Sequence, residues 1–439
     1  MRKSIATLFF LAVSLPGLAF AQENGTKADA QAPEGGVKGG QFSLEQAERI
    51  MNEKVAEKMR EISGVRQENI RKLEGLLQNP EYRKDPDRAP KVMHMLAENY
   101  WEEGLYQYLQ ARDVWDKAME QVYAGTLSEP PPEPIEDYSK SLEYYREILR
   151  SFPSYPRVDE VYYYLGKGAM KEGKTKQNRL LQKEGSEYLN RLVKDYPKSR
   201  FIAEAHLALA EYYFETNSMW FAKQNYEIII QKFPKSSMYN YALYKLAWVY
   251  FNLSEFEQSI DTFHKVVAQV SAEKSGGKGI IEFKNQALND LVVTYAEVDN
   301  GWVRARDYFK KILPDEETYA KLRMLGDLYV GQSKFVEAEA IFRHFIEREK
   351  TTPKIVEYFE IIIGIYTSTN DIRGLDNMVA EILEYFKPNG TWRTVNKANE
   401  DILAEADALT EKNLRFIANY YHRDAQKTNS RDTYQKTAD

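Results

Sequence analysis

Residues 201–270 carry a helix-hairpin pattern twice in succession, and few folds can accommodate it. In each copy a large residue precedes a small one, and an aromatic residue follows three positions later. A second set then places a small residue, an aromatic residue and an apolar residue at offsets of four and three. These offsets put apolar side chains on one face of two consecutive helices. The copies consist of Leu209, Ala210, Tyr213, Ala222, Tyr226, Ile229 and Pro234, and of Leu246, Ala247, Tyr250, Ser259, Phe263 and Val266.

Weaker copies of the pattern extend it in both directions. A proline follows eight residues after Tyr145, Leu189 and Tyr226, and it predicts a helix end each time because proline cannot continue a helix. The later copies contain Leu291, Tyr295, Ala305, Phe309 and Ile312, then Leu325, Gly326, Tyr329, Ala338, Phe342 and Phe345, then Ile362, Ile363, Tyr366, Leu375, Val379 and Ile382.

The offsets and the closing proline resemble the tetratricopeptide repeat (TPR), a unit of about 34 residues. This resemblance implies an all-α fold, a TPR-type α-solenoid in which helix–turn–helix repeats form a right-handed superhelix. We expect roughly seven or eight units with helical N- and C-terminal caps. The endings Pro197-Lys198-Ser199 and Pro234-Lys235-Ser236 resemble those of bacterial cell-envelope TPR proteins, a group that includes BamD, the Tol–Pal coordinator and gliding-motility components. That resemblance implies a periplasmic scaffold that holds protein partners.

Seven segments follow from these patterns and from local composition. We expect a signal peptide at 1–21, a disordered linker at 22–41, an N-terminal helical cap and degenerate repeat at 42–137, core TPR repeats at 138–270, C-terminal TPR repeats at 271–392, a C-terminal capping helix at 393–425 and a disordered tail at 426–439.

The first 21 residues have the three parts of a secretory signal: basic Arg2 and Lys3, an apolar run, and Ala19-Phe20-Ala21 as a cleavage site. A retained N-terminal anchor is the alternative. Cleavage would change the net charge from −6 to −8, which argues against nucleic acid as a partner. The chain has no cysteine and therefore no lipobox, so we expect an exported, periplasmic protein without its own lipid anchor.

Three further segments lie in the N-terminal half, and two of them allow two interpretations. Met95-Leu96-Ala97 with Tyr100 indicates a first helix, with residues 106–123 as its second. The proline-rich connector 129–134 is a spacer or a polyproline II ligand. The 171–185 insertion, rich in lysine, is a binding loop or a solvated, partly helical extension of its repeat.

Catalytic and metal-binding patterns do not emerge from the residues. The five histidines lie far apart in sequence, none in an H-E-x-x-H arrangement, and without cysteine no recurring ligand spacing appears. We therefore expect no catalytic, cofactor-binding or metal-binding residues, and no enzyme.

The remaining candidate for function is a binding surface made of aromatic residues. In a TPR array the first helix of each pair lines the concave face, where surplus aromatics can form a groove for an extended or helical peptide. The alternative is that a neighbouring repeat or the C-terminal helix covers them. The candidate groove residues are Tyr163, Phe214, Tyr241, Tyr244, Trp248 and Phe251.

The partner would be an envelope protein or a peptide segment, with outer-membrane or peptidoglycan association through such partners. Two other functions stay open at this point. One is a peptidoglycan-associated accessory factor that binds cell wall or recruits a wall enzyme, because aromatic rings stack on sugars as well as on peptides. The other is a helical-solenoid enzyme.

Overall fold

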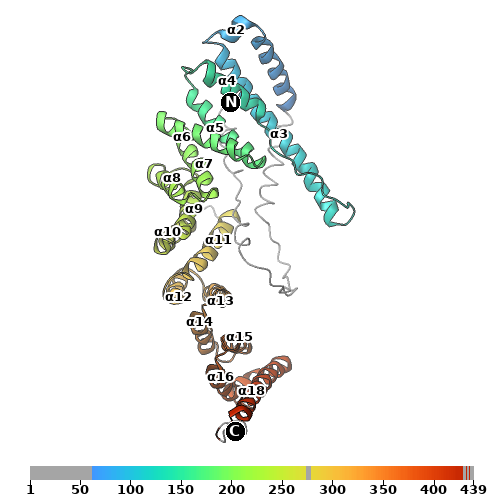
Figure 1. The fold of residues 1–439 in the computed structure, drawn as a ribbon, viewed down its shortest axis with the longest axis vertical. Coiled ribbons are helices and arrows are strands. Elements are labelled where there is room, and N and C mark those ends of the chain that lie inside the picture. The colour runs from blue at the N-terminus through green and yellow to red at the C-terminus, as the bar shows by residue number, and fades with distance from the viewer. Residues whose placement is uncertain (1–61, 273–277, 429–431, 433–434, 436–439) are drawn as a thin grey trace. The chain divides into compact units, whose positions relative to one another are not determined.

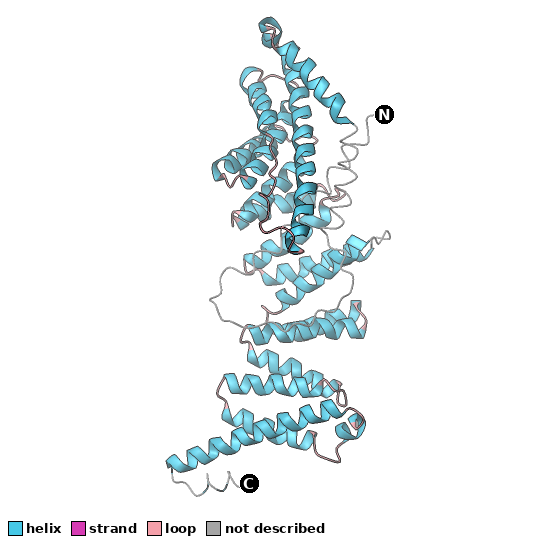
Figure 2. Cartoon of the chain, turned by 90° about the vertical axis from the view of Figure 1, so that its right-hand side faces the viewer, coloured by secondary structure: helices cyan, strands magenta, loops and turns pink. Residues whose placement is uncertain are grey.

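The computed structural model describes residues 62–272 and 278–428, together with Asp432 and Gln435. Within these residues the chain forms helices and connecting turns, and no strand occurs (Figure 2). Outside the described residues lie the predicted signal peptide 1–21, the predicted linker 22–41, residues 273–277 and most of the predicted tail. The chain divides into two compact units, Met1–Ile229 and Ile230–Asp439.

The described part of unit 1 begins with a helical segment at 62–77. This segment contacts α3, which is the longest helix among the described residues. Ion pairs from Arg66 to Glu102 and Glu103, both 3.3 Å, tie this segment to α3. Figure 1 labels the helices. They are α2 (Pro80–Lys84), α3 (Ala89–Tyr123), α4 (Ser139–Ser151), α5 (Val158–Thr175), α6 (Arg179–Asp195), α7 (Ile202–Glu215) and α8 (Met219–Lys232), the last of which continues to the start of unit 2.

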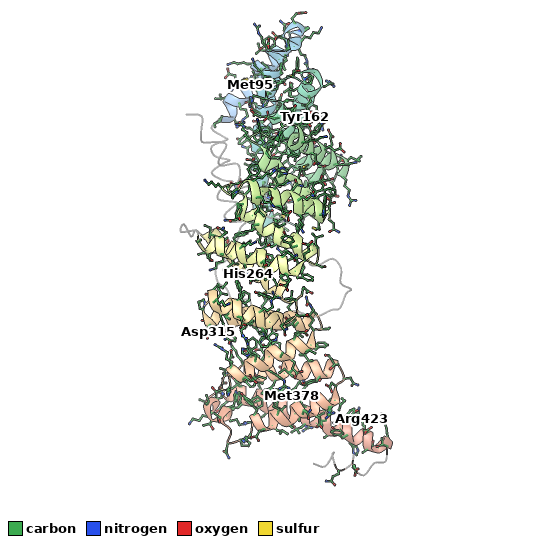
Figure 3. The ribbon with its side chains drawn as sticks, turned by 90° about the vertical axis from the view of Figure 1, so that its left-hand side faces the viewer. Met95, Tyr162, His264, Asp315, Met378 and Arg423 are labelled. Carbon is green, nitrogen blue, oxygen red and sulfur yellow. The ribbon has the colours of Figure 1, made fainter. Side chains whose placement is uncertain are left out.

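Unit 2 contains four further helix pairs and two terminal helices, and apolar side chains fill the space between neighbouring helices (Figure 3). The helices are α9 (Tyr239–Asn252), α10 (Phe256–Ala272), α11 (Lys278–Tyr295), α12 (Gly301–Ile312), α13 (Asp315–Gly331), α14 (Phe335–Arg348), α15 (Ile355–Ser368), α16 (Ile372–Tyr385), α17 (Thr391–Asn396) and α18 (Glu400–Thr428).

The described residues form seven helix pairs, α3–α4 through α15–α16, which agrees with the predicted seven or eight units. Each second helix has a buried residue at an equivalent position near its start, and in six of the seven pairs this residue is small. Four positions later a large side chain is buried. Small residues here allow the two helix backbones to approach closely. The contact and buried residues are Ser141 and Tyr145, Gly185 and Leu189, Ala222 and Tyr226, Ser259 and Phe263, Ala305 and Phe309, Ala338 and Phe342, and Leu375 and Val379.

Two of these contacts include a hydrogen bond between the paired helices. Ser141 Oγ donates to the Ala97 carbonyl at 2.7 Å, and Ser259 Oγ donates to the Ala247 carbonyl at 2.9 Å. The same geometry therefore occurs in α3–α4 and in α9–α10, although the serine and alanine are 44 residues apart in one pair and 12 in the other.

The turns within the pairs share a left-handed residue. Its φ lies between 51° and 59° in six pairs, and in five of them the next backbone N–H bonds to a carbonyl five residues earlier in the first helix, at 2.7 to 2.9 Å. This is the Schellman arrangement, which ends a helix and reverses the chain. Asparagine tolerates this conformation better than other non-glycine residues. The residues are Gln177, Asn217, Ser254, Asn300, Ser333 and Asn370.

The prediction of a second helix at 106–123 is wrong, because α3 continues without a break through Gly104 to Tyr123. Its partner is α4, which begins at Ser139, so the second helix of this pair lies beyond the predicted segment 42–137. The connector returns along α3: Trp115 Nε1 donates to the Pro131 carbonyl at 2.9 Å, and Arg112 pairs with Glu133 at 2.9 Å. Within unit 1, 129–134 therefore acts as a spacer.

The 171–185 insertion is helical on either side of a turn at 176–178, as expected of a partly helical extension of its repeat. It lengthens α5 to 18 residues and α6 to 17, whereas α7 and α8 have 14 each. Gly166 and Gly185 lie at the contact between α5 and α6, where a Cβ on Gly185 would come within 2.6 Å of the Gly166 carbonyl oxygen. The two helices remain close over their added turns because both carry glycine there.

The C-terminal cap differs in its start from the prediction of one helix over 393–425. A turn separates α17 from α18, and α18 runs from Glu400 to Thr428. Trp392 is buried and donates to the Thr352 carbonyl at 2.9 Å, while Tyr421 donates to Asp376 of α16 at 2.8 Å. No described helix is both long and apolar enough to span a membrane.

Candidate functional site

Four of the six candidate groove residues lie on α9 of unit 2, and we call them the α9 strip: Tyr241, Tyr244, Trp248 and Phe251. Their spacing of three, four and three residues places them on one face of the helix. All four are half-buried, so none is lost in the core and none projects freely. Edge-to-face contacts join Trp248 to Phe251, with ring centroids 5.3 Å apart, and continue to Phe256.

A buried carboxylate holds the middle of the α9 strip. Asp290 of α11 is only 5% exposed, and its Oδ2 accepts from the Tyr244 hydroxyl at 2.6 Å and from Trp248 Nε1 at 3.1 Å. Gln286 donates to the other oxygen at 2.8 Å. Burial raises the pKa of Asp290 and outweighs these hydrogen bonds, which lower it. The polar edges of Tyr244 and Trp248 are thus used inside the protein, and their rings are fixed in orientation.

The two remaining candidates, Tyr163 and Phe214, belong to unit 1. Tyr163 of α5 is 4% exposed, because its ring stacks on Phe201 with centroids 4.4 Å apart. The expectation that Tyr163 lines an open groove is therefore corrected: a residue preceding the next repeat covers it. Phe214 is half-buried near the end of α7.

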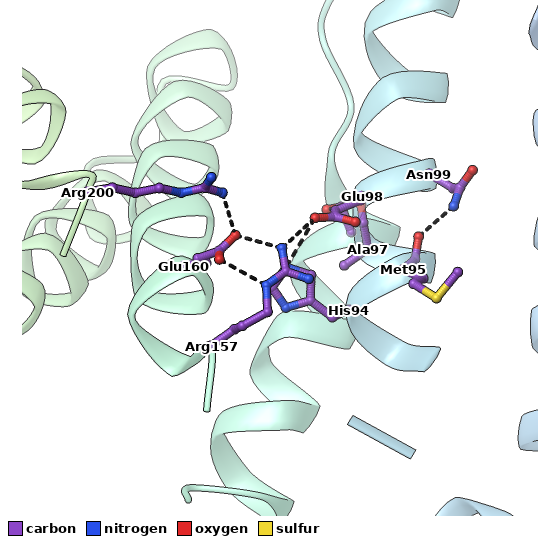
Figure 4. Close-up of polar contacts among 9 residues, drawn as sticks. His94, Met95, Ala97, Glu98, Asn99, Arg157, Glu160 and Arg200 are labelled. Atoms are coloured by element: carbon purple, nitrogen blue, oxygen red, sulfur yellow. Dashed lines mark hydrogen bonds and ion pairs between the residues drawn. The ribbon is translucent and has the colours of Figure 1, made fainter. Parts of the chain in front are cut away.

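A second cluster, which sequence patterns did not indicate, lies between α3 and α5 (Figure 4). His94 is fully buried, with Nε2 3.3 Å from Glu98 Oε1 but without hydrogen-bond geometry. Arg157 Nη2 bonds to Glu98 at 3.0 Å and to Glu160 at 2.7 Å. Arg200 also bonds to Glu160, at 2.9 Å. The four-residue spacing of His94 and Glu98 is visible in the sequence, but Glu160 comes 62 positions after Glu98.

The atoms of His94, Glu98 and Glu160 lie within 4.8 Å of one another, which is close enough for three ligands of one metal ion. Their electrostatics favour a different interpretation. Two arginines already neutralise the two carboxylates, so a divalent cation would have to displace both guanidinium groups. Burial alone would raise the pKa of Glu98 and Glu160, yet His94 and the arginines hold both values below the ordinary range. We interpret the cluster as an ion-pair network that joins α3, α5 and the residues before α7.

A half-buried histidine in unit 2, His264, predicts a pH-dependent stability. His264 of α10 stacks on Tyr308, with centroids 3.7 Å apart, and its Nε2 is 2.9 Å from the Tyr295 hydroxyl. Burial lowers the pKa of His264 to about 4. The unfolded chain therefore binds the proton more readily, so this stability is complete above about pH 6.5 and is lost progressively as the pH falls toward 4.

We expect the wild type to lose about 1 kcal/mol more stability between pH 7 and pH 5 than His264→Phe, after allowance for partial solvent screening. Chemical denaturation of both proteins at the two pH values measures the difference. His344, whose pKa is also lowered, is present in both and cancels. Equal losses in the two proteins would show that His264 is not held neutral by the fold.

The repeated hairpin contact defines the class of this chain: within its described residues it is an all-α protein of stacked helix pairs. The model of the tetratricopeptide repeat family matches residues 241–271, which span nearly all of α9 and α10. The chain thus contains a tetratricopeptide repeat in its α9–α10 pair.

Three solved structures are similar to it. A tetratricopeptide repeat protein from Parabacteroides merdae is 14% identical, with 68% of this chain and 99% of that chain covered and a TM-score of 0.30. The structure of Naa15/Naa10 bound to HypK-THB is 13% identical, with 82% of this chain and 52% of that chain covered and a TM-score of 0.35. The TPR domain of P58(IPK) is 13% identical, with 82% of this chain and 98% of that chain covered and a TM-score of 0.22. No curated protein matches the chain.

Proposed function

We propose that this chain is a non-enzymatic scaffold that binds protein partners within a bacterial cell envelope, and that the α9 strip is its principal contact. The TPR fold is that of a protein–protein interaction scaffold. The envelope assignment is supported by the signal-like residues 1–21 and by the Pro-Lys-Ser repeat endings.

The α9 strip is the observation that carries this proposal. Aromatic residues are the commonest anchors of protein interfaces because they remove a large apolar area from water at little cost in side-chain entropy. Here the rings are already ordered by Asp290 and by one another, so binding a partner would require little further ordering. The strip therefore suits an extended or helical peptide segment.

A non-enzymatic role is supported by the cluster of His94, Glu98 and Glu160 in the described part of the chain. Glu98 and Glu160 are both bound by arginine, and the pKa of each carboxyl group is held low, so neither is poised to exchange protons near neutral pH.

We expect Tyr241→Ala combined with Phe251→Ala to weaken partner binding at least about tenfold, because two interface aromatics are removed. These positions are chosen because they leave the Asp290 hydrogen bonds to Tyr244 and Trp248 in place. The partner is first recovered by affinity capture from an envelope fraction, with the tag at the C-terminus, and its affinity for both proteins is then measured.

Tyr123→Ala serves as the matched control, since Tyr123 is an 83% exposed tyrosine at the end of α3. Unchanged affinity of the double variant, with its circular dichroism intact, would contradict the role of the α9 strip. Recovery of no envelope protein, together with sedimentation of the chain with isolated sacculi, would favour the peptidoglycan-associated alternative.

A further inference from the structure

Two neighbouring turns in unit 1 expose apolar side chains at equivalent positions. Leu180 is the second residue of α6 and is 80% exposed; Trp220 is the second residue of α8 and is 58% exposed. Phe221, beside Trp220, is 49% exposed, with their ring centroids 5.1 Å apart. Folded chains seldom leave an exposed tryptophan and phenylalanine side by side without a contact to make.

The two turns are adjacent, because Lys174 at the end of α5 pairs with Glu215 at the end of α7 at 2.5 Å. We call them together the turn edge, residues 174–180 and 216–221. Tyr213 extends its aromatic surface inward, 5.1 Å from Phe221, and its hydroxyl accepts from Asn190 at 3.1 Å.

The two stretches that form the turn edge contain cations and no carboxylate, although carboxylates border them. Although the chain has a net charge of −6, the stretches 173–183 and 216–226 contain no aspartate or glutamate. They contain five cationic residues, of which those at the α5–α6 turn are exposed. Three of the lysines pair with glutamates just outside the stretches: Lys174 with Glu215, Lys176 with Glu172 and Lys183 with Glu187. In the Lys176 pair the glutamate side chain is 7% exposed and the lysine 37%, so the cation is the outer partner. The five residues are Lys174, Lys176, Arg179, Lys183 and Lys223.

We propose that the turn edge binds the surface of an anionic lipid bilayer, with Leu180, Trp220 and Phe221 entering the interfacial region and the cations contacting lipid phosphates. Exposed apolar side chains close to lysine and arginine match the surface of an anionic bilayer, which is apolar inside and negatively charged outside. Tryptophan in particular concentrates at the level of the headgroups. This inference does not rest on the scaffold function or on the α9 strip, which belongs to unit 2.

The full chain should co-sediment with vesicles of phosphatidylcholine mixed with phosphatidylglycerol, and less well with phosphatidylcholine alone. Leu180→Ser, Trp220→Ser and Phe221→Ser together should weaken binding to the mixed vesicles at least about tenfold. Lys176→Glu with Arg179→Glu should remove the preference for the anionic lipid, and added salt should weaken wild-type binding. All five positions are exposed, so the fold should survive, which circular dichroism checks.

Val336→Ser is the matched control. Val336 is also the second residue of a second helix and is 80% exposed, but Glu337 and Glu339 follow it where the turn edge has cations. The control should bind vesicles like the wild type. A wild type that stays in the supernatant, or a triple variant that still binds, would overturn the proposal. So would loss of a captured protein partner by the triple variant without any vesicle binding, since it would assign the turn edge to protein docking.

Discussion

Gly185→Ala should destabilise unit 1 by about 2–3 kcal/mol, an unusually large effect for the addition of one methyl group. The new Cβ would lie 2.6 Å from the Gly166 carbonyl oxygen, 2.6 Å from Met170 Cγ and 2.7 Å from Met170 N. Two of these are backbone atoms, so relief requires α5 and α6 to move apart. Leu189, buried one turn further along α6, would then lose its contact with Gly166.

The matched control is Gly75→Ala, in the helical segment 62–77 of the same unit. A Cβ there meets no atom within 4 Å, so alanine should stabilise the helix by about 0.5–1 kcal/mol. Chemical denaturation gives the two free energies, and hydrogen–deuterium exchange of the α5 and α6 amides locates the change. If both substitutions raised stability alike, the close contact of α5 and α6 would be refuted.

Gly185 also shows where sequence reasoning reached its limit. The offsets predicted Ala222, Ser259, Ala305 and Ala338 on the apolar face of their helices, and all four are buried. These offsets depend on a first helix of standard length, as in α9–α10, where Ala247 precedes its partner Ser259 by 12 residues. Such contacts are local, and the pattern therefore carries them. In α5–α6 the contact residue is displaced to Gly185, and this glycine, which ends the predicted insertion, is a packing position.

The same displacement explains the error at α3. Ala97 belongs to the predicted first helix, but its partner Ser141 lies 44 positions away, beyond the rest of α3 and the proline-rich connector. α3 has 35 residues, against 14 in α9. Gly104 lies within α3, where it lets the backbone of Asp137 approach the helix. Sequence periodicity records which face of a helix is apolar, but not how far the helix continues.

The candidate site was predicted in part for a related reason. Helical spacing correctly placed Tyr241, Tyr244, Trp248 and Phe251 on one face of one helix. The partners of that face come from elsewhere in the chain: Asp290 is 42 residues beyond Trp248, and Phe201 is 38 residues beyond Tyr163. Whether an aromatic ring is open, fixed or covered depends on such distant contacts, which a pattern within one repeat does not contain.

Asp290→Ala should destabilise unit 2 by about 2 kcal/mol, because it leaves the Tyr244 hydroxyl and Trp248 Nε1 without their acceptor between α9 and α11. Asp290→Asn should stay within about 1 kcal/mol of the wild type, since an amide oxygen can accept both bonds and a neutral group avoids burying a charge. The raised pKa of Asp290 reflects that burial: the folded state holds the proton more tightly, so stability falls as the pH rises through this pKa, and Asn removes the dependence.

Asp327→Ala is the control, an exposed aspartate on α13 whose ion pair with Arg323 should contribute at most about 0.5 kcal/mol. Denaturation midpoints test the stabilities, and partner affinity tests the consequence for function. With its acceptor gone, the α9 strip loses the orientation of its two central rings, so Asp290→Ala should weaken binding while Asp290→Asn preserves it. Equal damage by both substitutions would mean that the charge of Asp290, rather than its acceptor geometry, orders the strip; no damage by either would separate α11 from the strip altogether.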